Sequence, residues 1–189
     1  MKAIQHFKTI TTHKWLVMKN CFKVGLIRQG LTHDLSKYSP TEFMVGAKYY
    51  QGTRSPNAAE RDDTGISQSW IHHKGRNRHH WEYWTDMDPV KKVYVPVEMP
   101  RKYLAEMVMD RIAASRVYKG AEYTDACPLE YLLGSRESQL MNPQTFRELR
   151  YLLTMLKDFG EETTFRFIRE VVIPGKPFAE TANPEQEKA

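Results

Sequence analysis

Apolar residues recur at steps of three and four over the first thirty positions of the chain. One stripe is Trp15, Met18, Phe22 and Leu26. A second stripe is His13, Val17, Asn20, Val24 and Ile27. This period predicts one long helix over residues 2–29 with two apolar sides, which ends at Gly30.

The next segments combine a helix start with a polar loop. Ser39, Pro40 and Glu42 supply an N-cap serine, a first-turn proline and a capping glutamate, so a helix is expected from there to about Tyr50. Residues 51–66 are polar and predict a loop. Residues 67–84 predict a helix that breaks near Gly75 and resumes around His79.

The second half of the chain also has mainly helical patterns. Residues 85–97 look irregular, apart from a strand-like alternation at 93–97, and helices are expected over 98–119, 128–140, 144–159 and 162–172. Residues 174–189 are polar and predict a disordered tail. The sequence therefore predicts an all-α fold, a single helical bundle over residues 1–173.

Composition narrows the class of protein. A chain of 189 residues suits one domain with a sizeable core. Because no apolar run approaches about 18 residues, we expect no membrane-spanning helix and no membrane partner. The N-terminus lacks the pattern of a secretory signal, and Cys21 and Cys127 are too few for a disulfide framework, so a cytoplasmic location is expected.

The chain is basic, with a net charge of +5 and a pI near 9.1. This balance favours anionic partners, which include nucleotides, other phosphates and nucleic acid. The basic residues are scattered, so charge alone does not choose among these partners.

Imidazoles and indoles are concentrated in the stretch "HHKGRNRHHWEYW", residues 72–84. It holds four of the seven histidines, and three of the four tryptophans lie in it or just before it. The histidines are expected to be metal ligands or proton donors, and the tryptophans to pack the segment or stack on a nucleobase. The alternative is a surface cluster that only packs against a loop.

Two polar residues lie on apolar helix faces. Asp110 shares a face with Tyr103, Met107 and Val117. A buried carboxylate is costly unless it is paired, hydrogen-bonded or metal-bound, and a salt bridge to a neighbouring arginine is the plainer explanation. His13 lies on the second stripe of the first helix, where a lone histidine is more often a core residue than a ligand.

The dipeptide His33-Asp34 can present two ligands to one cation at a helix turn. Lys37 follows one turn later, where its ammonium can meet an anionic substrate. The alternative is that Asp34 caps a helix and His33 lies at the surface.

The order of these residues, H…HD…D, resembles the HD superfamily of metal-dependent phosphohydrolases, which are all-helical. The resemblance implies metal ligands at His13, His33, Asp34 and Asp110. "HDLSK" is similar to the "HDxxK" version of the motif, which implies that Lys37 lies near the scissile phosphate. Two-metal members use further histidines between these elements, where His73, His79 and His80 lie.

A closer resemblance rests on "HDLSKYSPTEF", "HHKGRNRHHWEYW" and "LAEMVMD". On these motifs the chain, from about His13 to about Tyr118, is identified as a member of an uncharacterised bacterial and phage family, domain of unknown function 5662. Its pattern H-x-x-x-N-R-H-H selects His73 over His72. The family implies no established activity.

Nitrogen and carboxylate ligands without thiolate favour one or two ions of iron, manganese, cobalt, nickel or zinc over calcium. The expected metal ligands are His13, His33, Asp34, His73 and Asp110. The expected catalytic residues are Lys37, Arg78, His79 and His80. Asn77 and Glu106 are expected to support them. Lys37 and Arg78 would neutralise a phosphoryl group, and a histidine would protonate the leaving oxygen.

The sequence thus predicts a hydrolase of phosphomonoesters or phosphodiesters, with a nucleotide as its substrate. Three alternatives stay open: an HD-type di-iron oxygenase with nearly the same ligands, a non-catalytic nucleic-acid-binding protein, and a structural protein with a metal staple. The sequence gives no prediction of the oligomeric state.

Overall fold

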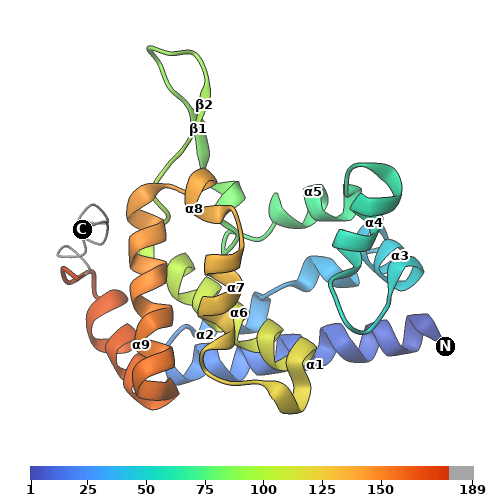
Figure 1. Cartoon of the computed structure of the whole chain (residues 1–189), viewed down its shortest axis with the longest axis horizontal. Helices are drawn as coiled ribbons and strands as arrows, with labels where there is room; N and C mark the ends of the chain where they lie inside the picture. The colour runs from blue at the N-terminus through green and yellow to red at the C-terminus, as the bar shows by residue number, and fades with distance from the viewer. Residues whose placement is uncertain (179–189) are drawn as a thin grey trace.

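The computed structural model describes residues 1–178, and in this part of the chain helices dominate (Figure 1). The α-helices are α1 (Lys2–Lys23), α2 (Ile27–Thr32), α3 (Pro40–Tyr49), α4 (Pro56–Thr64), α5 (Gln68–Lys74), α6 (Arg101–Lys119), α7 (Cys127–Gly134), α8 (Glu137–Leu140) and α9 (Pro143–Phe167). Short 3-10 helices are η1 (Leu35–Tyr38), η2 (Trp81–Tyr83) and η3 (Gly120–Glu122), and a π-helical turn, η4 (Ile168–Val172), follows α9. The all-α class is confirmed at this level.

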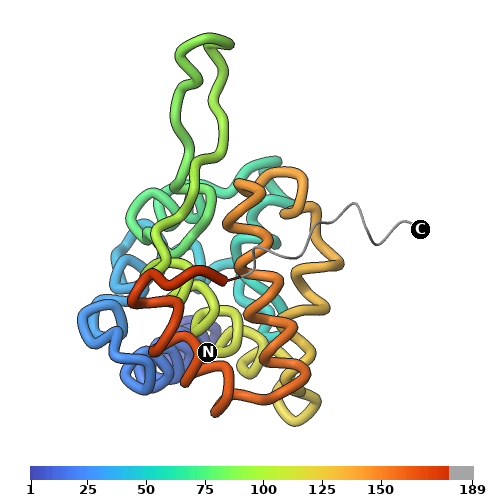
Figure 2. Tube along the Cα trace, turned by 90° about the vertical axis from the view of Figure 1, so that its left-hand side faces the viewer, coloured from blue at the N-terminus to red at the C-terminus, as the bar shows by residue number. Residues whose placement is uncertain are grey.

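One hairpin interrupts the helical pattern between α5 and α6. Strands β1 (Thr85–Met87) and β2 (Tyr94–Pro96) pair antiparallel, with Asp86 opposite Val95. Both views show the hairpin extending away from the helical body (Figures 1 and 2). The expectation of irregular structure over 85–97 was therefore wrong for six residues, and the alternation at 93–97 marked the second strand.

The predicted single helix over residues 2–29 was wrong. Gly25 has φ 84°, a left-handed conformation that glycine adopts without steric cost, and it separates α1 from α2. Gly30 lies inside α2 rather than at a helix end. A Cβ on Gly30 would lie 3.0 Å from the Cβ of Cys21, so the missing side chain allows α2 to fold back closely on α1.

Three other boundaries also differ from the prediction. The polar segment 51–66 contains α4, whose Glu60 is buried and accepts hydrogen bonds from Ser67 and Ser69. After Gly75 the chain resumes as the 3-10 turn η2, not as a helix at His79. The single helix expected over 128–140 is the pair α7 and α8, whereas the break expected near 160 is present at Gly160, with φ 75°.

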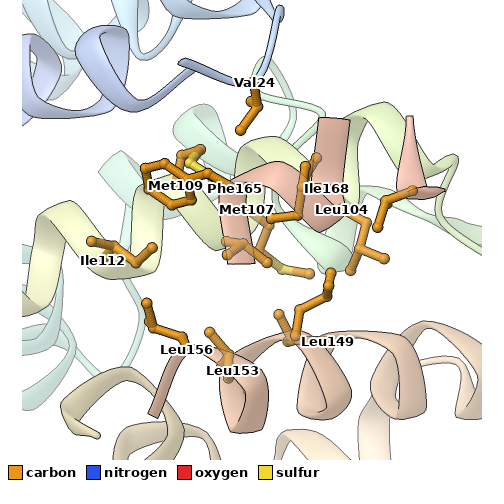
Figure 3. Packing of buried hydrophobic residues seen from close by; sticks show 14 of the residues in the cluster. Val24, Leu104, Met107, Met109, Ile112, Leu149, Leu153, Leu156, Phe165 and Ile168 are labelled. Carbon is orange, nitrogen blue, oxygen red and sulfur yellow. The ribbon is translucent and has the colours of Figure 1, made fainter. Parts of the chain in front are cut away.

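Helix α6 is the centre of the bundle, with α1, α7 and α9 packed against it. Figure 3 shows Leu149, Leu153 and Leu156 of α9 facing the apolar side chains of α6. The core of this contact is Leu104, Met107, Met109, Ile112, Leu149, Leu153, Leu156, Phe165 and Ile168. Each such side chain contributes about 1.5–3 kcal/mol when fully buried. The core therefore holds α6 rigidly and fixes the direction of its polar face.

The C-terminal segment continues onto this core as far as the structure describes it. Phe178 is buried, with its ring 5.6 Å from that of Phe167 and under the guanidinium of Arg101. Most of the disordered tail predicted for 174–189 falls on residues 179–189, which lie outside the described part. Among residues 1–178, no helix is long and apolar enough to cross a membrane.

Candidate metal centre

Residues with metal-ligating side chains converge from four segments of the fold. His13 comes from α1, and His33 and Asp34 from the turn between α2 and η1. The loop after α5 supplies His79 and His80, and His73 ends that helix. Asp110 comes from α6. Asp34 has φ 53° and ψ 25°, a left-handed conformation that aspartate tolerates better than most residues, and this turn aims its carboxylate inward.

The first group consists of His13, His33, Asp34 and Asp110, with ligand atoms within 4.8 Å of one another. His13 Nε2 lies 2.9 Å from Asp110 Oδ1 and 3.6 Å from Asp34 Oδ2. His33 Nε2 lies 3.3 Å from Asp34 Oδ2 and 3.5 Å from Asp110 Oδ1. These four are the residues that the H…HD…D order singled out.

The second group consists of Asp34, His73, His79 and His80, within the same 4.8 Å limit. His73 Nε2 lies 3.3 Å from Asp34 Oδ1, and His79 Nε2 lies 3.4 Å from the same oxygen. Asp34 thus belongs to both groups, and it turns one carboxylate oxygen toward each. The two groups are therefore adjacent and share the carboxylate of Asp34.

Many ligand atoms of the two groups are buried and make charged contacts with one another, but no hydrogen bond of good geometry among the described residues. This holds for His13 Nε2, His33 Nε2, Asp34 Oδ1, Asp34 Oδ2, His73 Nε2, His79 Nε2 and His80 Nε2. Buried polar atoms are hydrogen-bonded in the large majority of cases, and leaving one unsatisfied costs about 1–3 kcal/mol. Several imidazole nitrogens and carboxylate oxygens that converge at this distance without well-formed hydrogen bonds are the arrangement that a cation needs, so these residues fit a metal ion.

Two glutamates fix the orientation of the histidine rings. Glu106 Oε1 lies 2.9 Å from His33 Nδ1 and 3.2 Å from His79 Nδ1. Glu42 Oε2 lies 2.7 Å from His73 Nδ1. A carboxylate only accepts, so each Nδ1–H donates. When a ring is neutral, as metal binding requires, its Nε2 offers a lone pair to the centre. Carboxylates behind histidine ligands commonly serve this purpose in metal sites.

Asn77 supports the second group through backbone and side-chain contacts. Its Nδ2 donates to the carbonyl of His73 at 2.8 Å and to Ser36 Oγ at 2.8 Å. These bonds tie the end of α5 to η1, next to Asp34. Asn77 and Glu106 therefore lie where a supporting role was expected.

Electrostatics separate the histidines into two kinds. Burial lowers the pKa of His33, but the charge of Asp34 and hydrogen bonds to neighbouring carboxylates outweigh it and raise the pKa well above its ordinary value. Burial lowers the pKa of His80 well below that value, and the charges of His79 and His73 lower it further. His33 is therefore protonated in the metal-free protein at neutral pH, and His80 is neutral.

The carboxylates of the centre stay ionised. Burial raises the pKa of Asp34, but the positive charges of His33 and Lys37 hold it well below its ordinary range. Burial likewise raises the pKa of Asp110, and its hydrogen bonds with His13 and His33 outweigh this and lower it well below that range. Anionic oxygen ligands are thus available at neutral pH.

Lys37 and Asp110 mark the side of the centre that opens to solvent. Lys37 Nζ lies 2.6 Å from Asp34 Oδ2, and its side chain is 28% exposed. The side chain of Asp110 is 17% exposed, whereas those of Asp34 and His33 are almost completely buried. Solvent therefore reaches the centre on the side where Lys37 and Asp110 lie.

Arg78 does not join this group of residues. Its side chain is exposed, donates to Tyr103 Oη at 3.2 Å and lies over the ring of Tyr83. His72 also stays outside, with Nδ1 2.6 Å from Glu42 Oε1. The structure therefore brings together His73 rather than His72, and it separates Arg78 from Lys37.

The simpler explanation for Asp110, a salt bridge to a neighbouring arginine, is not what the structure shows, whereas the tryptophans do have a packing role. The arginines near Asp110 bond elsewhere, Arg111 to Glu137 and Arg116 to Glu161. The ring of Trp70 lies 4.7 Å from that of His80. Trp81 and Trp84 pack against the hydrophobic core, as expected of residues that hold the histidine segment in place.

Sequence reasoning missed Glu42 as a member of the site. The pattern Ser39-Pro40-Thr41-Glu42 predicts a capping box, but the Ser39 side chain makes no capping bond and Glu42 binds His72 and His73 instead.

Comparison with known proteins gives one match. No curated protein and no solved structure shows significant similarity to the chain. The model of a family of unknown function (DUF5662) matches residues 2–155, a span that holds every residue of the two ligand groups. The chain therefore belongs to this family.

Proposed function

We propose that the protein binds two transition-metal ions, one in each group, with Asp34 as the shared ligand. The observation that carries this proposal is the direction of the imidazoles. His33, His73 and His79 donate from Nδ1 to glutamates and present Nε2 to the two oxygens of Asp34. In a salt-bridge network alone we would expect well-formed hydrogen bonds between these Nε2 atoms and the carboxylate, and among the described residues these atoms make none.

The donor set narrows the choice of metal. It contains imidazole nitrogen and carboxylate oxygen, and both cysteines are free and buried elsewhere in the core. Such ligands suit iron, manganese, cobalt, nickel or zinc, and they disfavour calcium, which prefers oxygen alone.

We propose hydrolysis of a phosphomonoester or phosphodiester as the reaction, with a nucleotide as the substrate class. The resemblance to the HD superfamily points to this chemistry, and the basic net charge suits an anionic substrate. When bound, such ions act as Lewis acids and lower the pKa of water to near 7. In the proposed hydrolysis, the oxygen of water would join phosphorus and give up a proton, the ester P–O bond would break, and the leaving oxygen would take a proton from a histidine.

Lys37 has a defined part in this proposal. In the absence of a metal its ammonium is the counterion of Asp34 Oδ2, the oxygen that the first group would offer to a cation. A cation bound there would take over this charge balance and free Lys37 for an anionic oxygen of the substrate. Burial lowers the pKa of Lys37, but the negative charges of Asp34 and Asp110 outweigh burial and raise this pKa above its ordinary value, so the side chain stays cationic.

A panel of phosphoesters tests the reaction. The protein would be stripped of metal, loaded separately with manganese, iron, cobalt, nickel or zinc, and assayed for phosphate release from nucleotides and generic phosphodiesters. Turnover that is lost in His33→Ala and retained in His72→Ala supports the proposal, because His72 lies next to His73 in the sequence but outside both ligand groups. No turnover with any metal, in protein that retains the metal, contradicts the hydrolase assignment.

An oxygenase would use nearly the same ligands, so iron-loaded protein needs a separate measurement. Oxygen uptake together with a near-ultraviolet or visible absorption band, without phosphoester turnover, would favour the di-iron oxygenase over the hydrolase.

A further inference from the structure

Lysines and arginines are scattered along the chain, but the net positive charge falls at one end of the sequence. Residues 1–33 contain six lysines and arginines and no aspartate or glutamate, so they carry +6 with neutral histidines. The whole chain carries +5, and residues 34–189 therefore carry −1. All six of these cations lie on α1 and α2.

The exposed face of α1 combines this charge with large apolar side chains. Its outward stripe follows steps of four, three, four, four and three: Ile4, Lys8, Thr11, Trp15, Lys19 and Phe22. Ile4 is 65% exposed and Trp15 is 55% exposed. His13 lies on the opposite, buried face, so the stripe is separate from the metal centre. Figure 1 shows α1 along the lower edge of the molecule, away from the hairpin.

Helix α2 extends this surface next to the C-terminal half of α1. Gly30 packs directly on Cys21 and the Phe22 ring, and Lys14 Nζ donates to the Leu31 carbonyl at 2.8 Å. Ile27 and Leu31, four residues apart, are both about half exposed. The α1–α2 surface is defined as Ile4, Lys8, Trp15, Lys19, Phe22, Lys23, Ile27, Arg28 and Leu31.

The cations of the α1–α2 surface have no acidic partner in the described part of the chain. Within residues 1–178, no carboxylate forms an ion pair with Lys8, Lys19, Lys23 or Arg28. Lys19 lies over the Trp15 ring and Lys23 over the Phe165 ring. Their charge is therefore available to an external anionic partner.

We propose that the α1–α2 surface docks on a membrane that contains anionic lipids, with α1 in the plane of the headgroups. Lysine near an anionic bilayer contributes about 1 kcal/mol per residue, and tryptophan favours the interface between headgroups and acyl chains. Exposed Ile4, Ile27 and Leu31 suit this apolar boundary. This revises the expectation of no membrane partner, which considered only spanning helices.

A nucleic acid is the less suitable occupant. Single-strand binders use a groove that follows the phosphates and aromatic rings that stack on bases. Here the surface is the outside of a helix, and its isoleucines and leucine offer neither stacking nor hydrogen bonds. The proposal is independent of the reaction proposed for the metal centre.

Co-sedimentation of the full chain with vesicles tests the proposal. Vesicles of phosphatidylcholine with phosphatidylglycerol should retain the protein at low salt, and vesicles of phosphatidylcholine alone should not. Replacing Lys8, Lys19 and Lys23 by glutamine should weaken binding on the order of 100-fold, at about fivefold for each lysine. Trp15→Ala should weaken it too, although the net charge is unchanged.

A control variant of equal net charge separates the surface from general electrostatics. It replaces Lys91, Lys92 and Lys119, which are exposed elsewhere on the molecule, and it should bind nearly as the natural protein does. Circular dichroism would verify that each variant is folded. Absence of binding to anionic vesicles, or equal losses in the two triple variants, would overturn the proposal. A single-stranded oligonucleotide could also displace the protein from the vesicles and bind it more tightly than they do. That result would overturn the proposal in favour of a nucleic-acid-binding surface.

Discussion

Asp34→Asn is the substitution whose consequences follow most directly from the geometry. Asparagine has nearly the same shape and also tolerates the left-handed backbone at this turn, with φ 53°. The change removes the negative charge that Lys37 contacts at 2.6 Å and that His33 contacts at 3.3 Å. It also replaces one of the two carboxylate oxygens that the ligand groups share.

The expected loss of stability without metal comes from the uncompensated cations. Removing one partner of a buried ion pair costs about 3–5 kcal/mol. The lower end applies here because the Lys37 side chain is 28% exposed and can turn toward water. For a chain of this size each kcal/mol shifts the Tm by about 2–4 °C, so a decrease of roughly 6–12 °C is expected in chelator.

Adding metal should separate the variant further from the natural protein. At a free metal concentration of about 100 times the Kd, binding stabilises the folded state by about 2.7 kcal/mol, or roughly 5–11 °C in Tm. Thermal unfolding followed by circular dichroism, with chelator and with manganese or zinc, measures both effects. Asp62→Asn is the matched control, because Asp62 is exposed and its ion-pair partner among residues 1–178 is Arg54, at the surface. A metal-induced shift in Asp34→Asn as large as in the natural protein would refute the reasoning.

Three further predictions concern protons, ring orientation and packing. Because the pKa of His33 is raised, metal binding at neutral pH should release protons, which calorimetry in buffers of different ionisation enthalpy would detect. In metal-free protein, the stability contributed by protonated His33 is complete below about pH 6.5 and is lost as the pH rises through the pKa of His33 in the folded state. A metal affinity that falls as the pH rises through this window would contradict the assignment of His33 as a ligand. Glu106→Gln should lower metal affinity about 10–100-fold in a folded protein, because the carboxylate orients His33 and His79; unchanged affinity by competition titration would remove it from the site. Gly46→Ala should destabilise the fold by about 1–3 kcal/mol, since the new Cβ would lie 2.2 Å from His6 Nε2; urea unfolding with unchanged stability would mean that His6 moves freely.

The sequence predicts the helical class, and the residues that come together at the candidate centre, better than it predicts the residues that support them. Periodicity finds α6 because its apolar face is long, and residue order finds Asp34 and Asp110 because ligand types are chemically distinctive. The sequence does not identify Glu42 as part of the site, because its neighbouring residues match the pattern of a helix cap. Its long-range contact with His73 depends on how α3 and α5 pack, which local patterns do not contain.

The positions of turns were also predicted poorly, for a related reason. Gly25 breaks the first helix through a positive φ, yet the apolar stripe continues across it and suggests one helix. The fold-back that results places His33 beside His13, with ring centroids 5.6 Å apart. A continuous helix would have carried these residues about 30 Å apart, at 1.5 Å per residue.

Metal analysis of untagged protein by plasma mass spectrometry tests most directly whether two metal sites share Asp34. The protein would be reconstituted with a transition metal at about pH 8, where imidazole ligands are largely neutral, and then freed of excess metal. Two equivalents per chain are expected in the natural protein and in His72→Ala, fewer in Asp110→Asn, and none in Asp34→Asn. No bound metal in the natural protein, or an unchanged metal content in Asp34→Asn, would contradict the proposed centre.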